Sequence, residues 1–268
     1  MLKNSENNSD IETKASLDAT DPINVLMYHS ISHEPGPTSI PPDVFREQMA
    51  TLRDCGYNSV KLSDLASWHS GETILPPRSC VITFDDGFAD FADDAMPVLE
   101  ANKLTATVFL PAAQMGSHEN WDGPNGLSRR LMTWQQAAEL ANQGVEFGSH
   151  SMTHADLTTL GPEELHWELH QSRSEMEQHL QTTPVSFAPP YGRSSSSVRA
   201  AISKCYRISV GTRLQRASRQ CDLFDVPRVE MHYFRNPDRW RAYLEGRGEW
   251  FFLARRVLRR IRAAVSNG

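Results

Sequence analysis

Residues 80–87 read CVITFDDG, and this stretch decides the class of fold. Five apolar or β-branched residues form a run typical of a buried strand, and two aspartates and a glycine follow it directly. In parallel α/β folds the carboxyl ends of the strands form the active face. The stretch therefore predicts a central parallel strand with acidic side chains at its functional end.

Apolar runs of the same kind recur along the chain. They span residues 23–28, 106–110, 145–148, 185–188, 207–210 and 225–229. Helical patterns lie between most of them, with caps expected at Asp43 and Thr133, a start at Gly161-Pro162 and a further helix over 194–204. About seven strands alternate with helices in this way. The pattern predicts parallel strands with helices outside, in a barrel or a doubly wound sheet.

The 268 residues suffice for one large domain. Residues 1–21 are polar, so we expect a disordered arm before a main domain over 22–235 and a basic helical tail over 236–268. The arm lacks the apolar core of a secretory signal, and no apolar run reaches the roughly 18 residues of a spanning helix. The sequence therefore predicts a cytoplasmic protein.

Residues 247–262 read RGEWFFLARRVLRRIR, which places arginines around an apolar helical stripe. One interpretation is a helix packed on or next to the domain with a solvated basic face. The alternative is a surface helix that contacts anionic lipid and makes the protein membrane-associated. Liposome co-sedimentation with and without residues 247–268 separates the two.

The net charge and the cysteine spacing argue against two classes of protein: nucleic-acid-binding proteins and proteins with a cysteine zinc site. A formal net charge of -6 argues against a nucleic-acid partner, which favours a basic surface. The four cysteines, at 55, 80, 205 and 221, include no CxxC pair, which argues against a cysteine zinc site. We expect free or buried thiols, with two disulfides as the alternative.

Asp85 and Asp86 lie where the strand over 80–84 is expected to end. Two free neighbouring carboxylates would repel each other. A cation bound by one relieves the repulsion and leaves the other available as a base. The alternative is an ordinary Asp-Asp-Gly turn, which Gly87 would also suit.

His150 and His154 follow another expected strand end. A spacing of four places two imidazoles on one side of a helical turn, as a single metal ion requires. The alternative is two unrelated surface histidines. Two imidazoles, a carboxylate from Asp86 and an open position constitute a catalytic zinc-type site. One divalent ion is expected, with Zn as the default and Co, Ni or Mn compatible with the same ligands.

These motifs resemble those of a known family. The segments Thr83–Gly87 and His150–His154, together with Phe187–Gly192, resemble the polysaccharide deacetylases, the NodB-like group of carbohydrate esterase family four. The resemblance covers roughly residues 23–232 and makes 22–235 the catalytic domain. It implies a distorted barrel of about seven β/α units.

The resemblance also implies roles for individual residues. Asp85 corresponds to the general base, and Asp86, His150 and His154 to the metal ligands. Tyr191 corresponds to a tyrosine whose backbone N–H binds the oxyanion.

One position departs from the common family pattern, because Ala188 stands where many members have an arginine that orients the base. A subgroup that acts on bacterial surface polysaccharides also lacks this arginine, and the chain resembles it at residues 25–29 and 226–229. By that resemblance His29 is the catalytic acid, and Arg228 supplies the missing guanidinium. A surface ion pair is the alternative for Arg228, and His232 is a competing candidate for the acid.

The implied function is metal-dependent hydrolysis of an N-acetyl group, or an O-acetyl group, from a carbohydrate. An N-acetylated amino sugar in a bacterial surface polysaccharide or its precursor is the expected substrate. Trp121, in the long loop over 112–130, is a candidate for stacking on a sugar ring, with simple packing as the alternative. Two other functions stay open: a catalytically weak carbohydrate-binding protein on the same fold, and a hydrolase of a non-sugar amide. The sequence specifies neither the glycan nor an oligomeric state.

Overall fold

A computed structural model describes residues 22–121, 123 and 126–247. The expected disordered arm and most of the basic tail lie outside the described residues, so both stay predictions. The division of the chain at residue 235 also stays a prediction. Within the described part, no helix is long and apolar enough to cross a membrane.

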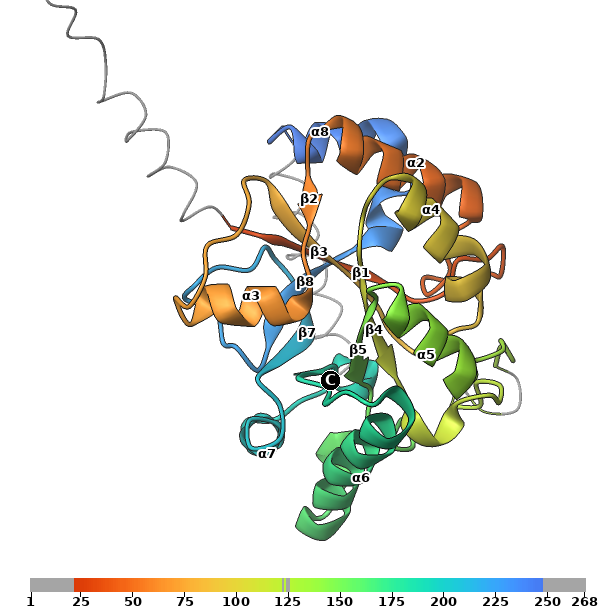
Figure 1. Cartoon of the computed structure of the whole chain (residues 1–268), viewed down its shortest axis with the longest axis vertical. Coiled ribbons are helices and arrows are strands. Elements are labelled where there is room, and N and C mark those ends of the chain that lie inside the picture. Colours follow the sequence, from red (N-terminus) through yellow and green to blue (C-terminus); the bar gives the residue numbers. More distant parts are fainter. Residues whose placement is uncertain (1–21, 122, 124–125, 248–268) are drawn as a thin grey trace, which may run out of the picture.

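Seven parallel strands close into a barrel, which confirms the predicted fold (Figure 1). The ring closes because β1 pairs with β8 on one side and with β3 on the other. A two-residue strand, β2 (Asn58–Ser59), pairs with β3 outside the ring. In chain order the barrel strands are β1 (Asn24–Tyr28), β3 (Ser79–Phe84), β4 (Thr107–Leu110), β5 (Glu146–Ser149), β6 (Ser186–Phe187), β7 (Ile208–Leu214) and β8 (Val226–Glu230).

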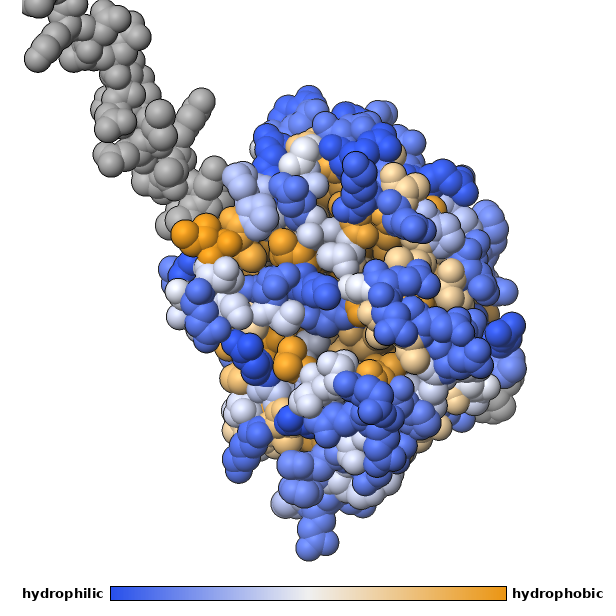
Figure 2. All heavy atoms as spheres, viewed as in Figure 1, coloured by the Kyte–Doolittle hydropathy of each residue, from blue (hydrophilic) through white to orange (hydrophobic). Residues whose placement is uncertain are grey.

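Helices surround the strands in Figure 1, and the face in Figure 2 is largely hydrophilic. The helix α4 continues a π-helical turn, η1 (Phe91–Ala95). The α-helices are α2 (Pro42–Asp54), α3 (Leu62–His69), α4 (Met96–Ala101), α5 (Trp134–Asn142), α6 (Pro162–Leu180), α7 (Ser196–Ile202) and α8 (Pro237–Leu244). Short 3₁₀ turns are η2 (Ala112–Gln114), η3 (Leu157–Thr159), η4 (Pro190–Gly192) and η5 (Met231–Phe234).

Alternation along β1 directs its side chains into two different clusters of the core. On β1, Leu26 and Tyr28 belong to a cluster with side chains of the surrounding helices, whereas Val25 belongs to a second cluster with residues from other strands. This is the period of two that a strand imposes. The helix α3 packs on the second cluster through Leu65 and Trp68.

The structure agrees with some of the local predictions and differs from others. Thr133 caps α5 and accepts a hydrogen bond from the backbone N–H of Gln136, as predicted. Asp43 is not a cap: α2 begins at Pro42, whose fixed φ suits the first helical position, and Asp43 lies in the first turn. Neither α3 nor β2 was predicted. All four cysteines are free, which agrees with the expected thiols.

Candidate active site

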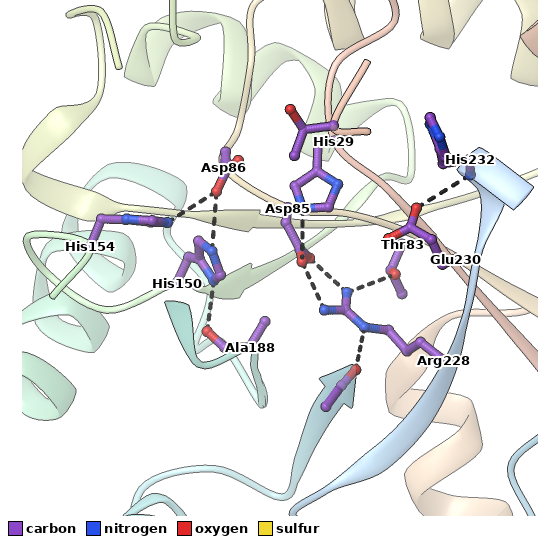
Figure 3. A network of polar contacts seen from close by, with 12 residues as sticks. His29, Thr83, Asp85, Asp86, His150, His154, Ala188, Arg228, Glu230 and His232 are labelled. Carbon is purple, nitrogen blue, oxygen red and sulfur yellow. Dashed lines mark hydrogen bonds and ion pairs between the residues drawn. The ribbon is translucent and has the colours of Figure 1, made fainter. Parts of the chain in front are cut away.

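The carboxyl ends of the barrel strands bring the predicted site residues together, although their positions in the sequence are far apart. Asp85 and Asp86 follow β3, His150 follows β5, and Arg228 lies on β8 (Figure 3). Asp85, Asp86 and His150 border a cavity of about 360 Å³, and Arg228 lies behind Asp85. Its lining includes Met27, His29, Thr38, Asp85, Asp86, Trp121, Arg129, His150, His154, Tyr191, Thr212 and Glu230.

Asp86, His150 and His154 form a buried cluster that fits a metal ion. The Oδ1 atom of Asp86 lies 3.2 Å from the Nε2 atom of each histidine. Their three ligand atoms all lie within 4.8 Å of one another. The backbone carbonyl of Ala188 lies 2.7 Å from Nδ1 of His150. A proton on Nδ1 then donates to this carbonyl and leaves Nε2 directed at the site, which is the usual support of a metal-binding histidine.

The pKa shifts follow from this packing. Burial favours the neutral form of Asp86, but its contacts with the His150 and His154 imidazoles outweigh burial and hold the pKa of the carboxyl well below its ordinary value. Burial lowers the pKa of His154 below the ordinary value of an imidazole. A neutral imidazole is the form that binds a metal ion, so this shift favours binding through His154. For His150, burial lowers the pKa, but the carboxylates of Asp86 and Asp85 outweigh it and raise the pKa.

The segment from His150 to His154 is a loop, so the predicted helical turn is wrong. Ser151 and His154 have φ angles of 68° and 64°. Side chains replace the backbone bonds of a helix: the Ser151 hydroxyl accepts from the N–H of His154, at 3.0 Å, and the Ser149 hydroxyl accepts from the N–H of Ser151. The two imidazoles still converge, but through this loop geometry.

Backbone strain is concentrated at this site. Besides Ser151 and His154, Asp86 and Tyr191 also have left-handed φ angles, of 72° and 60°. Such conformations cost non-glycine residues of the order of 1–3 kcal/mol each and persist where the surroundings hold them. Their concentration around one cavity indicates a functional site.

Glu168 of α6 holds the metal-ligand loop from behind. Its buried carboxylate accepts hydrogen bonds from the N–H groups of Met152 and Thr153, at 2.8 and 3.0 Å, and from the Thr153 hydroxyl. We expect Glu168→Gln to weaken metal binding about 10–100-fold, the usual effect of removing a support behind the ligands. Metal titration followed by calorimetry tests this, with Glu177→Gln, at a half-exposed position of the same helix, as the control. Equal affinities for wild type and Glu168→Gln would contradict it.

Arg228 forms a buried, bidentate ion pair with Asp85. Its two terminal nitrogens lie 2.7 Å from the two carboxylate oxygens, and its Nε donates to the carbonyl of Gly211 at 2.8 Å. The side chain is only 1% exposed, which excludes the alternative of a surface ion pair. Burial opposes ionisation of Asp85, but the Arg228 guanidinium outweighs it and lowers the pKa of the carboxyl.

The two candidates for the catalytic acid differ in position. The Nε2 atom of His29 lies 3.8 Å from Oδ2 of Asp85, and the side chain lines the cavity. His232, on η5, is not part of that lining; its backbone N–H donates to Glu230. Figure 3 shows His29 next to Asp85 and His232 beyond Glu230. The geometry therefore favours His29.

Aromatic rings form one wall of the cavity. Trp121 stacks on His154, with ring centroids 4.0 Å apart, and the ring of Tyr191 lies 4.8 Å from the same imidazole. Trp121 therefore packs on a candidate metal ligand and also borders the space open to a substrate.

Arg129 was not predicted as part of the site. It pairs with the buried Glu119 at 2.6 Å, donates to the Ser39 hydroxyl and stacks over Phe88. It thereby ties the long loop to the segment around Thr38, and both border the cavity. The signal in the sequence was the length of the loop, which identified no single residue.

Comparisons with known proteins agree with this geometry. The family model for polysaccharide deacetylases matches residues 73–207. "Putative polysaccharide deacetylase YxkH" of Bacillus subtilis is 31% identical over 82% of this chain and 75% of its own length. Poly-beta-1,6-N-acetyl-D-glucosamine N-deacetylase of Escherichia coli is 30% identical over 47% of this chain, but over only 20% of its own length.

Solved structures share the fold. The Streptococcus pyogenes deacetylase PplD, in complex with acetate, superposes with a TM-score of 0.69 at 24% identity, over 78% of this chain and 92% of its own. IcaB from Ammonifex degensii superposes with a TM-score of 0.69 at 23% identity, over 85% and 97%. The closed seven-strand barrel is common to these proteins. On its sequence motifs, its barrel and its match to the family model, the chain belongs to the polysaccharide deacetylase family.

Proposed function

We propose that the protein is a metal-dependent hydrolase that removes the N-acetyl group from an amino sugar of a surface polysaccharide or its precursor. The observation that carries the proposal is the position of Asp85. This carboxylate lies beside the buried Asp86-His150-His154 cluster, in the same cavity, and is held by Arg228 rather than by the cluster. A base next to a cation site is what metal-assisted amide hydrolysis requires.

A divalent cation held by Asp86, His150 and His154 would supply Lewis acidity, which polarises the acetyl carbonyl and lowers the pKa of water. Two imidazoles and one carboxylate suit Zn, and Co, Ni and Mn are compatible. Each remaining chemical role falls to a residue of the chain.

Asp85 accepts a proton from the attacking water as the new C–O bond forms. Arg228 keeps the carboxylate ionised and fixes its orientation through both oxygens. The backbone N–H of Tyr191 donates to the carbonyl oxygen as negative charge develops there. His29 donates a proton to the sugar nitrogen while the C–N bond breaks. The products are acetate and a free amino sugar.

Substitutions can determine whether His29 or His232 is the catalytic acid. We expect His29→Asn to lower kcat about 10²–10⁴-fold, the usual contribution of a general acid. His232→Asn is the matched control and should change kcat little, because its ring lies outside the cavity lining. A larger loss in His232→Asn than in His29→Asn would reverse the assignment.

A non-catalytic carbohydrate-binding protein is the second candidate function. A carbohydrate-binding protein does not need the carboxylate of Asp85, which is buried in an ion pair with Arg228 beside the candidate metal ligands. A hydrolase of non-sugar amides stays compatible with the same residues, since loops around a site determine its substrate.

Acetate release from a panel of substrates tests the proposal. The panel contains N-acetylated oligosaccharides, O-acetylated oligosaccharides and acetylated peptides, each with the intact, metal-loaded protein. We expect acetate from the N-acetylated sugars, with one new amine per acetate. Release from the peptides alone would indicate the non-sugar amidase, and release from none would favour the binding protein.

A further inference from the structure

A second, shallower groove lies on the other side of the metal-ligand loop. It has a volume of about 480 Å³ and is bordered by Thr153, Ala155, Leu160, Glu163, Glu164, Trp167 and Glu168. Thr153 and Ala155 flank His154, which borders the catalytic cavity. Residues of this loop thus alternate between bordering the cavity and bordering the groove, and the loop separates the two. The groove and the cavity are therefore neighbours across this loop.

Trp167 gives the groove an aromatic surface. Its side chain is 48% exposed on α6, and in the described part of the chain only Ile74, Trp167 and Tyr191 are exposed large hydrophobic residues. Hydrophilic side chains dominate the surface over α6 (Figure 2). An exposed indole beside the apolar side chains of Ala155 and Leu160 offers a flat surface for the C–H face of a sugar ring.

The charged residues of the groove are acidic. Glu163 and Glu164 lie in the first turn of α6, and no lysine, arginine or histidine is among the described residues that border the groove. Glu164 also accepts a hydrogen bond from the N–H of Gly161 and so caps the helix. Glu163 is exposed and has no hydrogen bond or ion pair within the described residues, so its carboxylate is available to a ligand. An ammonium group is the natural partner of these carboxylates.

We infer that this groove binds a sugar unit that has already lost its acetyl group. The inference rests on the proposed function, because deacetylation converts a neutral amide into an amine that is protonated near neutral pH. Trp167 would stack on the ring, and Glu163 would face the ammonium. A partly deacetylated glycan then binds with one free amino sugar in the groove and an acetylated unit in the cavity, so the protein prefers partly deacetylated chains.

Binding of a glucosamine pentasaccharide to the full chain tests the inference. This ligand has no acetyl group, so it is not turned over during calorimetry. We expect Trp167→Ala to weaken binding about tenfold, in line with truncation of an exposed aromatic anchor. Glu163→Gln should weaken binding and also flatten its dependence on ionic strength, because screening acts on the charge pair. Ile74→Ala, which removes another exposed apolar side chain, is the matched control.

Kinetics give a second readout. On a partly deacetylated pentasaccharide, Trp167→Ala should raise KM with kcat unchanged, whereas an acetylated monosaccharide should show no change. Unaltered pentasaccharide affinity in Trp167→Ala and Glu163→Gln overturns the inference. If those variants bind normally while the wild type releases acetate, only the inference fails. If no glycan releases acetate from the metal-loaded wild type, the proposed function fails as well.

Discussion

Asp85→Asn is expected to lower kcat by about 10²–10⁴-fold, the range for loss of a general base, while the protein stays folded and keeps its metal. Asparagine has nearly the same shape as aspartate but cannot accept the water proton. Its oxygen still accepts one hydrogen bond from Arg228, and the ligands Asp86, His150 and His154 are unaltered. The metal ligands are therefore preserved, but the buried Arg228 guanidinium loses its counter-charge, so we also expect a loss of stability in this variant.

Three measurements separate these effects: initial rates of acetate release, metal content per chain and the midpoint of thermal unfolding. Asp93→Asn is the matched control, because this aspartate lies in the same segment but is exposed. A variant at Asp85 that retains more than a tenth of wild-type kcat with full metal content would contradict its role as base.

Arg228→Met is expected to have the largest effect on stability. Breaking a buried pair by removing one partner costs about 3–5 kcal/mol, because the other charge stays buried without compensation. Here the carboxylate of Asp85 loses both short contacts, and the carbonyl of Gly211 loses a donor. Equilibrium unfolding in denaturant measures the loss. A free energy of unfolding equal to that of the wild type would contradict the account of this pair.

The pH dependence of Arg228 variants follows from the same contact. In the wild type, burial raises the pKa of Asp85, and the guanidinium overcomes this to hold the pKa below its ordinary value. A carboxyl of this kind stabilises the fold above its unfolded pKa, and the contribution is lost as pH falls through the folded pKa. Arg228→Lys keeps a charge but not the bidentate geometry. We expect its acid limb of activity to shift to higher pH, with partial activity near neutrality.

Much of the barrel could be predicted from local patterns, because short apolar runs that end in polar residues are characteristic of buried parallel strands. The residues alone left a barrel and a doubly wound sheet open. What separates the two is the pairing of β1 with both β3 and β8, a contact between distant segments. Local periodicity contains no such information, and only the family resemblance pointed to closure.

Local sequence patterns also could not predict all of the candidate site. Arg228 is separated from Asp85 by 143 positions, so no local pattern links the two side chains. Family resemblance suggested the pairing, and the geometry places both oxygens of Asp85 on the guanidinium. The spacing of His150 and His154 fits a helical turn as well as a loop. The segment forms a loop because the Ser151 hydroxyl and the carboxylate of Glu168, which lies on α6, accept hydrogen bonds from its backbone N–H groups.

Removal and restoration of the metal tests the central claim most directly. The intact chain is stripped with a chelator, divided, and assayed for acetate release from an N-acetylglucosamine oligosaccharide before and after addition of one equivalent of Zn, Co, Ni or Mn. We predict no activity in the stripped protein, recovery with at least one of these ions, and no recovery in a His150→Ala, His154→Ala double variant. Full acetate release by the stripped protein, with no metal detected, would contradict the account.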